Sequence, residues 1–212
     1  MIENPAENSI IGIAVSIGGP TALLEILNEV PEDFFTPIII VQHIAEGFTK
    51  GMAAWLDKEC EIEVKEAANE DKINPGAVYI APSGYQLKIS KGRRAIVTRE
   101  DIPGIFHKPS ADITLTSLAE VYGGGTIGVI MTGMGRDGVE GIKAIRDAGG
   151  YTIAQDEETS TIYGMNQEAV NEGTVTEILP LNSITDRLVE LCTGARIEDK
   201  IQFEKQLLNR SD

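Results

Sequence analysis

The chain has 212 residues, a length that suits one domain with short extensions and is too small for two full domains. Its 18 basic and 33 acidic side chains give a net charge of −15, which argues against general binding to nucleic acid or to anionic lipid. A hydrophobic content of 42% with 24% charged residues is typical of globular proteins rather than of disordered or coiled-coil chains.

Cysteines and histidines are scarce. Cys60 and Cys192 lie far apart and the chain has only 2 histidines, so neither a disulfide framework nor a Cys/His zinc site is expected. The N-terminus lacks the basic segment and apolar run of a signal peptide, and no apolar stretch approaches the roughly 18 residues of a membrane span. We therefore expect a cytoplasmic protein without membrane insertion.

Three segments are expected along the chain. Residues 1–8 form a polar tail, residues 9–194 form the one folded domain, and residues 195–212 form a charged helical extension. The sequence contains no internal repeat and no low-complexity linker that would mark a second domain.

Two strand–helix pairs open the domain. The apolar run Ile10–Val15 ends in a glycine-rich turn, and Pro20 suits the first turn of a helix whose apolar residues continue to Val30. The run Ile38–Val41 then precedes a second helical pattern that reaches Leu56. Two such pairs in succession predict parallel strands.

A different pattern occupies the stretch from Cys60 to Thr98. Short alternating segments are separated by turns rich in Gly and Pro, which predicts a β-hairpin or β-meander attached to the sheet. The segments expected as strands are Ala77–Ala81, Gln86–Ser90 and Arg94–Thr98.

The second half returns to strand–helix alternation. Ser110 or Asp112 can cap a helix that runs to about Tyr122, and the apolar strand Thr126–Met131 leads through a glycine loop into a helix that ends near Ala148. Further strands are predicted at 151–154 and 175–178, and further helices after residue 164 and near 184–191. The fold class predicted is α/β: a doubly wound, mostly parallel sheet of six or seven strands, flanked by helices, with the hairpin or meander as an insertion.

Three side chains follow predicted strands at positions suited to chemistry. Ser16 follows the first strand, His43 follows the second, and Asp137 lies in the glycine loop after a later strand. Because the carboxyl ends of parallel strands meet at one edge of a sheet, these loops converge on one crevice. A hydroxyl, an imidazole and a carboxylate can serve as a nucleophile, a general base and the group that orients the base.

The turn around Ser16 supports two interpretations. Gly18 and Gly19 would let the backbone approach a substrate, as in a nucleophile elbow. That motif usually has Gly two residues before the serine, however, and Ala14 stands there. In the alternative interpretation Ser16 caps the helix that starts near Pro20.

The histidine and the aspartate also have structural alternatives. A lone histidine is more often structural than catalytic, but His43 at a strand end is better placed than His107, which lies in a proline-flanked loop and is expected to be solvated. Asp137 can instead cap the helix that begins at Gly138. The amide groups of the same loop could bind a developing oxyanion.

A dinucleotide site is the main alternative function. Gly133, Gly135 and Gly138 spell G-x-G-x-x-G between a strand and a helix, and Asp156 ends the next strand. Against this Rossmann-like interpretation, the carboxylate of Asp137 would face the pyrophosphate, and the motif does not lie in the first strand–helix pair.

A basic cluster also stands out in the acidic chain. Such clusters are usually solvated strand faces, although this one could meet an acidic protein partner. Its members are Lys88, Lys91, Arg93, Arg94 and Arg99.

Three motifs together resemble the catalytic domain of the CheB chemotaxis receptor methylesterases. They are Ala14-Val15-Ser16-Ile17-Gly18-Gly19, Gln42-His43 and Thr132-Gly133-Met134-Gly135-Arg136-Asp137-Gly138. Supporting segments are Tyr79-Ile80-Ala81-Pro82, His107-Lys108-Pro109-Ser110-Ala111-Asp112, Thr152-Ile153-Ala154-Gln155-Asp156 and Tyr163-Gly164-Met165. The resemblance extends from about residue 10 to residue 192.

The resemblance implies hydrolysis of glutamate γ-methyl esters on methylated chemoreceptors, which can be membrane-bound, often with deamidation of receptor glutamines. Ser16 would attack the ester, His43 would move the proton and Asp137 would orient the imidazole. The backbone amides of Met134 and Ile17 would bind the oxyanion. The resemblance implies neither a metal nor an organic cofactor.

Two features depart from the family pattern. The family usually has Thr after the nucleophile, and this chain has Ile17, which keeps the amide and loses a hydroxyl. Regulated members carry an N-terminal receiver domain, whereas about nine residues precede the first predicted strand here, so control by phosphorylation is not expected within this chain.

Overall fold

The computed structural model describes residues 8–193. Of the predicted tail 1–8 only Asn8 is described, and the predicted extension 195–212 lies outside the described residues. The strands are β1 (Ile10–Val15), β2 (Ile38–Gln42), β3 (Glu63–Glu66), β4 (Ala77–Ile80), β5 (Gln86–Ile89), β6 (Ala95–Thr98), β7 (Thr126–Ile130), β8 (Tyr151–Gln155) and β9 (Glu177–Leu179). The α-helices are α1 (Gly19–Asn28), α2 (Thr49–Glu59), α3 (Ala111–Tyr122), α4 (Val139–Asp147), α5 (Met165–Asn171) and α6 (Leu181–Thr193), and a 3-10 turn spans Gly123–Gly125.

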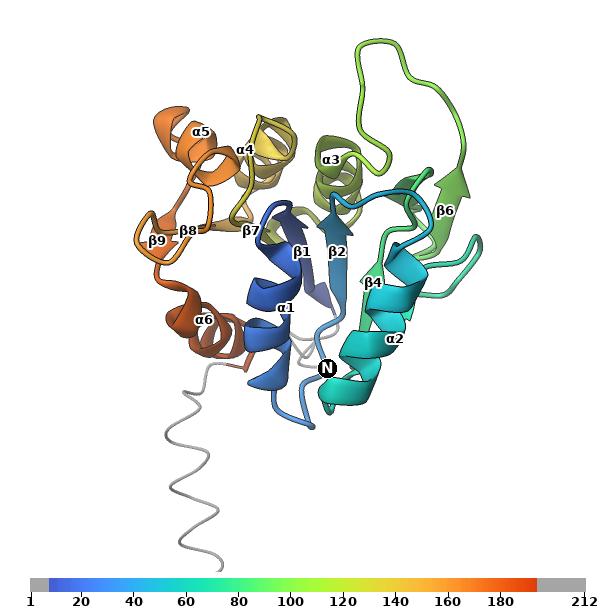
Figure 1. Ribbon diagram of the computed structural model, residues 1–212, viewed down its shortest axis with the longest axis horizontal. Helices are drawn as coiled ribbons and strands as arrows, with labels where there is room; N and C mark the ends of the chain where they lie inside the picture. The colour runs from blue at the N-terminus through green and yellow to red at the C-terminus, as the bar shows by residue number, and fades with distance from the viewer. Residues whose placement is uncertain (1–7, 194–212) are drawn as a thin grey trace, which may run out of the picture.

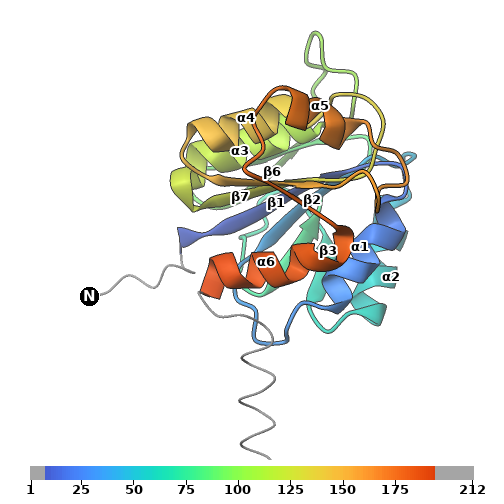
Figure 2. The same ribbon diagram turned by 90° about the vertical axis from the view of Figure 1, so that its left-hand side faces the viewer.

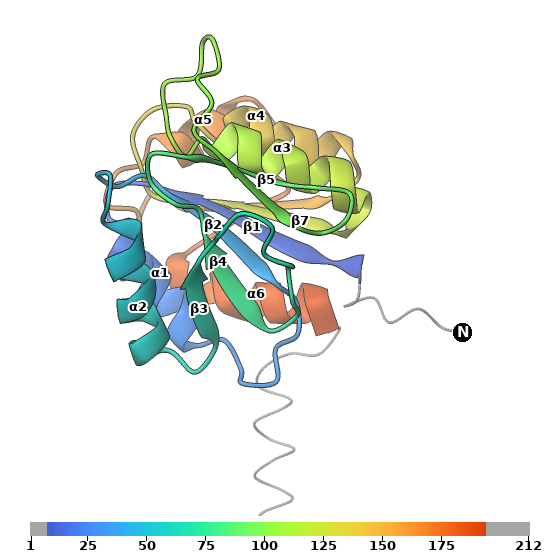
Figure 3. The same ribbon diagram turned by 90° about the vertical axis from the view of Figure 1, so that its right-hand side faces the viewer.

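Seven of the strands form one central sheet in the order β3-β4-β2-β1-β7-β8-β9, and every neighbouring pair is parallel. Helices α1, α2 and α6 cover one face, and α3, α4 and α5 cover the other (Figures 1 and 2). Strands β5 and β6 form a separate antiparallel hairpin on the α3 side, as Figure 3 shows. The expected doubly wound α/β fold is therefore confirmed.

The three innermost strands explain why their sequences read as continuous apolar runs. Every residue of β1, β2 and β7 is buried, because helices cover both faces of the sheet. The core accordingly falls into two clusters, one on each side of the sheet. Gly12 in β1 is part of this packing, since a Cβ there would lie 2.4 Å from Leu115 Cδ2 of α3.

Of the predicted hairpin or meander, the hairpin is confirmed, and the first of its three expected segments lies elsewhere. The segment expected at Ala77–Ala81 is β4, which pairs in parallel with β2 and β3 inside the central sheet. Strand β3 was not predicted, since Glu63, Lys65 and Glu66 make it look like a polar loop. The remaining two segments form the hairpin as expected. Short strands with turns between them give the same pattern in a meander and at the edge of a parallel sheet.

The order of the strands fixes where a site can lie. The chain runs outward from β1 to β2 on one side, and later returns to place β7 on the other side of β1. A crevice forms beyond the carboxyl ends of strands at such a reversal. Among residues 8–193, no helix combines the length and the apolar composition needed to cross a bilayer.

Candidate active site

Ser16 lies at the carboxyl end of β1 in a tight turn that leads into α1. Its amide donates to Thr132 O at 3.0 Å, and its carbonyl accepts from Gly19 N at 3.0 Å. Gly18 occupies the left-handed region with φ 83°, which a glycine adopts without strain. The turn thus leaves the Ser16 side chain half-buried at the edge of the sheet.

His43 lies next to Ser16 across the β1–β2 pair. Val15 and Gln42 are in register, and His43 N donates to Val15 O at 3.0 Å, so Ser16 and His43 follow paired ends of neighbouring strands. Neighbouring strands lie about 4.8 Å apart. The register of the sheet therefore places the backbones of the predicted nucleophile and the predicted base side by side, although no hydrogen bond joins their side chains.

Asp137 reaches the same place from the loop after β7. Its Oδ2 lies 2.7 Å from His43 Nε2. Its carboxylate also accepts from Ser110 Oγ at 2.7 Å, from Ala111 N at 2.7 Å and from Asp112 N at 3.2 Å. Only 9% of Asp137 is exposed, so four donors hold one buried carboxylate in a fixed orientation.

These contacts set the charge of Asp137. Burial alone would raise its pKa, but the hydrogen bonds from His43, Ser110 and Ala111 outweigh burial and hold the pKa of Asp137 below its ordinary value. The carboxylate is therefore ionised at neutral pH and can only accept. Since it faces Nε2, that nitrogen carries the proton, and Nδ1 of His43 is left with the free lone pair.

Asp112 and Asp137 each cap the helix that follows the other residue's segment: Asp137 caps α3 and Asp112 caps α4. Asp137 receives amides from the first turn of α3, whereas Asp112 Oδ1, which belongs to α3, accepts from Gly138 N at 2.8 Å and Gly141 N at 2.9 Å at the start of α4. Burial, with the nearby Asp137 charge, raises the pKa of Asp112 against these two hydrogen bonds. The exchange locks the Asp137 loop between the two helices.

His107 belongs to the site, although it is exposed as expected for a residue of its loop. Its ring stacks on that of His43, with centroids 4.3 Å apart and an interplanar angle of 8°. Burial, followed by the neighbouring His43, lowers the pKa of His107. A second imidazole therefore covers one face of the His43 ring.

Two amides stand free beside the serine. Among the described residues, neither Ile17 N nor Met134 N donates a hydrogen bond to the protein. A Cβ built on Gly133, the residue before Met134, would lie 2.7 Å from Ser16 Cβ, which places this loop against the serine. Free amides next to a nucleophile are the donors that an oxyanion hole requires.

The structural alternatives for Ser16 and Asp137 are wrong. Gly18 occupies the N-cap position of α1 and Gly138 that of α4, so neither Ser16 nor Asp137 is the N-cap residue of the helix that follows it. Asp137 does bond to the start of a helix, but that helix is α3, from a distant part of the chain. Within residues 8–193 Ser16 Oγ forms no hydrogen bond, so it has no structural task there.

The dinucleotide interpretation meets a physical obstacle. In that motif the first amides of the helix bind the pyrophosphate. Here the Asp112 carboxylate occupies Gly138 N and Gly141 N, and a second carboxylate, Asp137, lies beside it. Asp156, the expected ribose ligand, instead accepts from Thr159 N at 3.0 Å. The buried carboxylate of Asp137 and the half-buried one of Asp112 would repel the phosphates.

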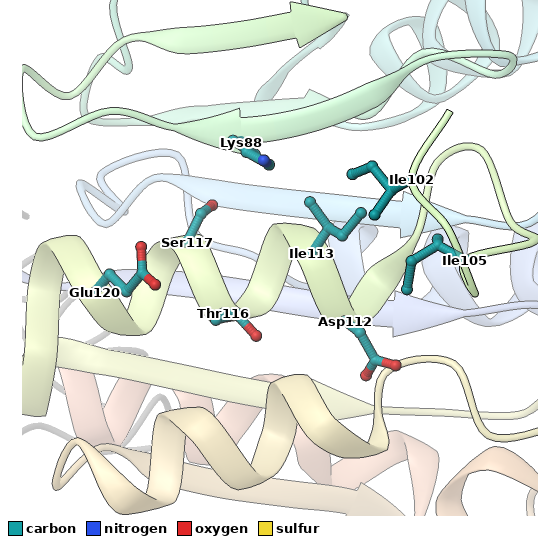
Figure 4. A pocket seen from close by; sticks show the side chains of 8 residues that line it. All are labelled: Lys88, Ile102, Ile105, Asp112, Ile113, Thr116, Ser117 and Glu120. Carbon is teal, nitrogen blue, oxygen red and sulfur yellow. The ribbon is translucent and has the colours of Figure 1, made fainter. Parts of the chain in front are cut away.

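Two hollows lie near the site without including Ser16, His43 or Asp137. One, of about 490 Å³, flanks His107 and is lined by Glu46, Gly84, Arg99, Asp101, Phe106 and Lys108. The other, of about 370 Å³, lies between the hairpin and α3 and is lined by Lys88, Ile102, Ile105, Asp112, Ile113, Thr116, Ser117 and Glu120. In Figure 4, Ile113 and Ser117 face the hairpin, whereas Asp112 points toward the start of α4.

The predicted basic cluster lies on and around the hairpin and is largely engaged within the protein. Arg93 lies over the Tyr122 ring, Arg94 donates to Glu70 O at 2.8 Å, and Arg99 lies 3.1 Å from Glu46. Within residues 8–193, no group of three or more His, Cys, Asp or Glu side chains could hold a metal ion.

Gly133 offers a direct test of the packing around Ser16. A Cβ at this position would lie 2.5 Å from Met165 Sδ and 2.7 Å from Ser16 Cβ. We expect Gly133→Ala to displace the Ser16 turn and to lower kcat about 10²-fold, the effect typical of misplacing a reacting group by about 1 Å. Steady-state ester hydrolysis measures this effect.

The matched control is Gly51→Ala in α2. A Cβ on Gly51 meets nothing within 4 Å, so this variant should keep full activity and gain up to about 1 kcal/mol of stability. Equal activity of the Gly133 and Gly51 variants would show that the loop does not constrain the serine.

Several contacts of the site were not predicted. Ser110 and Ala111 are expected at a helix start and in a segment of the family resemblance, but neither expectation includes their bonds to Asp137. The link between Gln42 and the serine turn is not predicted either. The sequence signals that mark them are local: a polar residue before a helix and a glutamine at a strand end. Neither signal identifies the distant residue to which the side chain bonds.

The chain is similar to proteins of known activity. The CheB methylesterase family model matches residues 11–188. A protein-glutamate methylesterase/protein-glutamine glutaminase of Carboxydothermus hydrogenoformans is 46% identical over 184 residues, covering 84% of this chain and 54% of that protein. The protein-glutamate methylesterase FrzG of Myxococcus xanthus is 45% identical over 187 residues, covering 88% of this chain and 55% of FrzG. The crystal structure of the Thermotoga maritima CheB methylesterase catalytic domain superimposes with a TM-score of 0.81 at 39% identity, covering 86% of this chain and 98% of that one.

Proposed function

The chain belongs to the CheB methylesterase family, and on this premise we propose that it hydrolyses glutamate γ-methyl esters on chemoreceptor proteins and releases methanol. The chain spans about half the length of the curated relatives it matches, since they are covered to 54% and 55%. Substrate and activity are therefore proposed from the site. We further propose a cytoplasmic location, because Cys60 and Cys192 are both unpaired and suit a reducing compartment.

One observation supports the proposal above all others. The Asp137 carboxylate, held by the start of α3, lies 2.7 Å from His43 Nε2, and this leaves Nδ1 as the basic nitrogen beside a serine. A Ser-His-Asp triad needs the aspartate on one imidazole nitrogen and the serine on the other. In the serine-protease triad the aspartate faces Nδ1 and Nε2 is the base, so the two nitrogens would exchange roles here. Since Ser16 Oγ makes no hydrogen bond among the described residues, its contact with Nδ1 forms when the substrate is bound, as in other ligand-free hydrolases.

The proposed reaction has two halves. In the first, Ser16 Oγ attacks the ester carbonyl while His43 Nδ1 takes the hydroxyl proton, and Asp137 stabilises the imidazolium. The oxyanion accepts from the amides of Ile17 and Met134. When the tetrahedral intermediate collapses, the C–O bond to the methoxy group breaks, and His43 returns the proton to the leaving methanol.

In the second half, water hydrolyses the glutamyl-serine ester. His43 Nδ1 removes a proton from water, the hydroxide adds to the carbonyl carbon, and the bond to Ser16 Oγ breaks as the serine regains its proton. The product is a free glutamate side chain. A glutamine side chain would follow the same course with ammonia as the leaving group, so we propose deamidation as a second activity of the same site. Each step uses only protein groups and water.

The experiment is methanol release from methylated chemoreceptor. Receptor carrying a radiolabelled methyl ester is incubated with the purified chain, and volatile label is measured over time. We expect turnover that depends on Ser16 and is unaffected by added NAD(H). The absence of any turnover from methylated receptors, together with a thermal shift on addition of NAD(H), would contradict the proposal.

A further inference from the structure

Gln42 connects the two segments that carry the serine and the histidine. It is the last residue of β2 and is 1% exposed. Its Nε2 donates to Ser16 O at 2.8 Å and to His43 O at 2.9 Å. One buried amide group therefore holds the backbones on both sides of the proposed catalytic contact.

The bonds from Gln42 act where the sheet no longer fixes the chain. The last ladder bond between these strands is His43 N to Val15 O, at 3.0 Å. Beyond it, Ser16 O accepts from Gly19 N within the turn and from the Gln42 side chain. Gln42 thus extends the β1–β2 register past Val15, and it sets the spacing of Ser16 and His43.

The oxygen of the Gln42 amide group indicates that stability alone does not account for a glutamine at this position. Among the described residues, Gln42 Oε1 is buried and has no hydrogen-bond partner. A buried acceptor without a partner is unfavourable, and an apolar side chain of the same shape would avoid this cost. The side chain also requires Gly19 opposite, because a Cβ there would lie 1.9 Å from Oε1.

We propose that Gln42 is a positioning residue, which acts through the backbones of Ser16 and His43 to bring Ser16 Oγ within reach of His43 Nδ1. It touches neither the reacting atoms nor the substrate. This inference rests on the proposed function for its substrate, but the spacing of Ser16 and His43 can be measured without that substrate.

The first test is Gln42→Met, which keeps the volume and removes the donor. The rate at which a fluorophosphonate labels Ser16 reports activation of the nucleophile, and methanol release reports turnover. We expect both the labelling rate and kcat to fall about 10-fold to 100-fold, with KM changed less than threefold, because a misplaced nucleophile slows chemistry and not binding.

The control variant is Thr185→Val. Thr185 is 1% exposed, and its Oγ1 donates to Ile26 O at 3.0 Å, so this change also removes one buried bond from a side chain to a carbonyl. Its position in α6 keeps it away from Ser16 and His43. A loss of Tm in the control with an unchanged labelling rate would separate positioning from stability.

The second test approaches the same contact from Gly19. The three nearest neighbours of a Cβ at Gly19 are all atoms of Gln42. Gly19→Ala should therefore lower the labelling rate about as much as Gln42→Met does. In a Gln42→Ala background, where the obstructing atoms are gone, the same change should lower it less than twofold further, because the two sites act on one contact.

The outcomes are distinct. Full labelling and full kcat in Gln42→Met, or equal effects of Gly19→Ala in both backgrounds, would overturn the positioning role. Wild-type chain that is labelled at Ser16 but releases no methanol would overturn only the proposed substrate, and the labelling series would still decide the role of Gln42. A wild-type chain that resists labelling would overturn both.

Discussion

Replacement of Ser16 by alanine is expected to lower the rate of methanol release on the order of 10⁶-fold, because it removes the atom proposed to form the covalent intermediate. The fold should tolerate the change. Since Ser16 Oγ has no hydrogen-bond partner among the described residues, the free energy of unfolding should change by about 0.5 kcal/mol or less. Initial-rate assays and thermal unfolding measure the two quantities.

The matched control is Ser183→Ala near the start of α6, a half-buried serine whose Oγ lies 3.4 Å from Asn182 Oδ1. It should keep full activity. Methanol release by the Ser16→Ala variant within about tenfold of the wild-type rate would rule out Ser16 as the nucleophile.

Asp137→Asn is expected to lower kcat on the order of 10⁴-fold, as loss of the orienting carboxylate does in other triads. An amide group facing His43 Nε2 can favour the wrong tautomer and move the proton to Nδ1, where the base is needed. The variant should also lose stability, by about 1–3 kcal/mol, because Asp137 accepts from Ser110, Ala111 and Asp112.

The stability effect carries a pH signature with a defined sign. The pKa of Asp137 is lowered in the folded state, so its contribution is fully present above the ordinary aspartate pKa of about 3.9 and is lost as the pH falls through the lowered value. The part of the unfolding free-energy gap between wild type and Asp137→Asn that comes from the carboxylate should therefore be present at about pH 5 and should shrink as the pH falls below about 4. Chemical denaturation at several pH values measures it. Asp147→Asn, at an exposed position of α4, is the control, and a gap that does not depend on pH would show that the carboxylate is not held as described.

Much of the fold can be predicted from the sequence because its inner strands are covered on both faces. Apart from Gln42 and Thr126, the runs that form β1, β2 and β7 are apolar, each leads into a helix, and their carboxyl ends carry Ser16, His43 and the Asp137 loop. In a parallel sheet this order is enough to place the three side chains at one edge. Strand ends and residue types therefore suffice to predict where these three side chains lie, whereas their catalytic roles stay predictions.

What could not be predicted depends on contacts between distant segments. Strand β4 has the same local pattern as a meander strand, and only its pairing with β2 and β3 places it in the central sheet. Likewise Asp137 has the pattern of a capping residue, but it binds α3 instead of the helix that follows it. A polar side chain bonds to a donor or acceptor that lies near it in space. The spacing of residues along the sequence indicates only those partners that are close in the sequence.

The central claim, that Ser16 and His43 act as one unit, is tested most directly by comparing the kcat of Ser16→Ala, His43→Ala and the double variant. If the two side chains share one proton transfer, each single variant removes nearly all of the rate, and the double variant is slower than either by less than about threefold. If the losses of the two single variants instead multiply in the double variant, Ser16 and His43 act independently, and the triad assigned to this site is wrong.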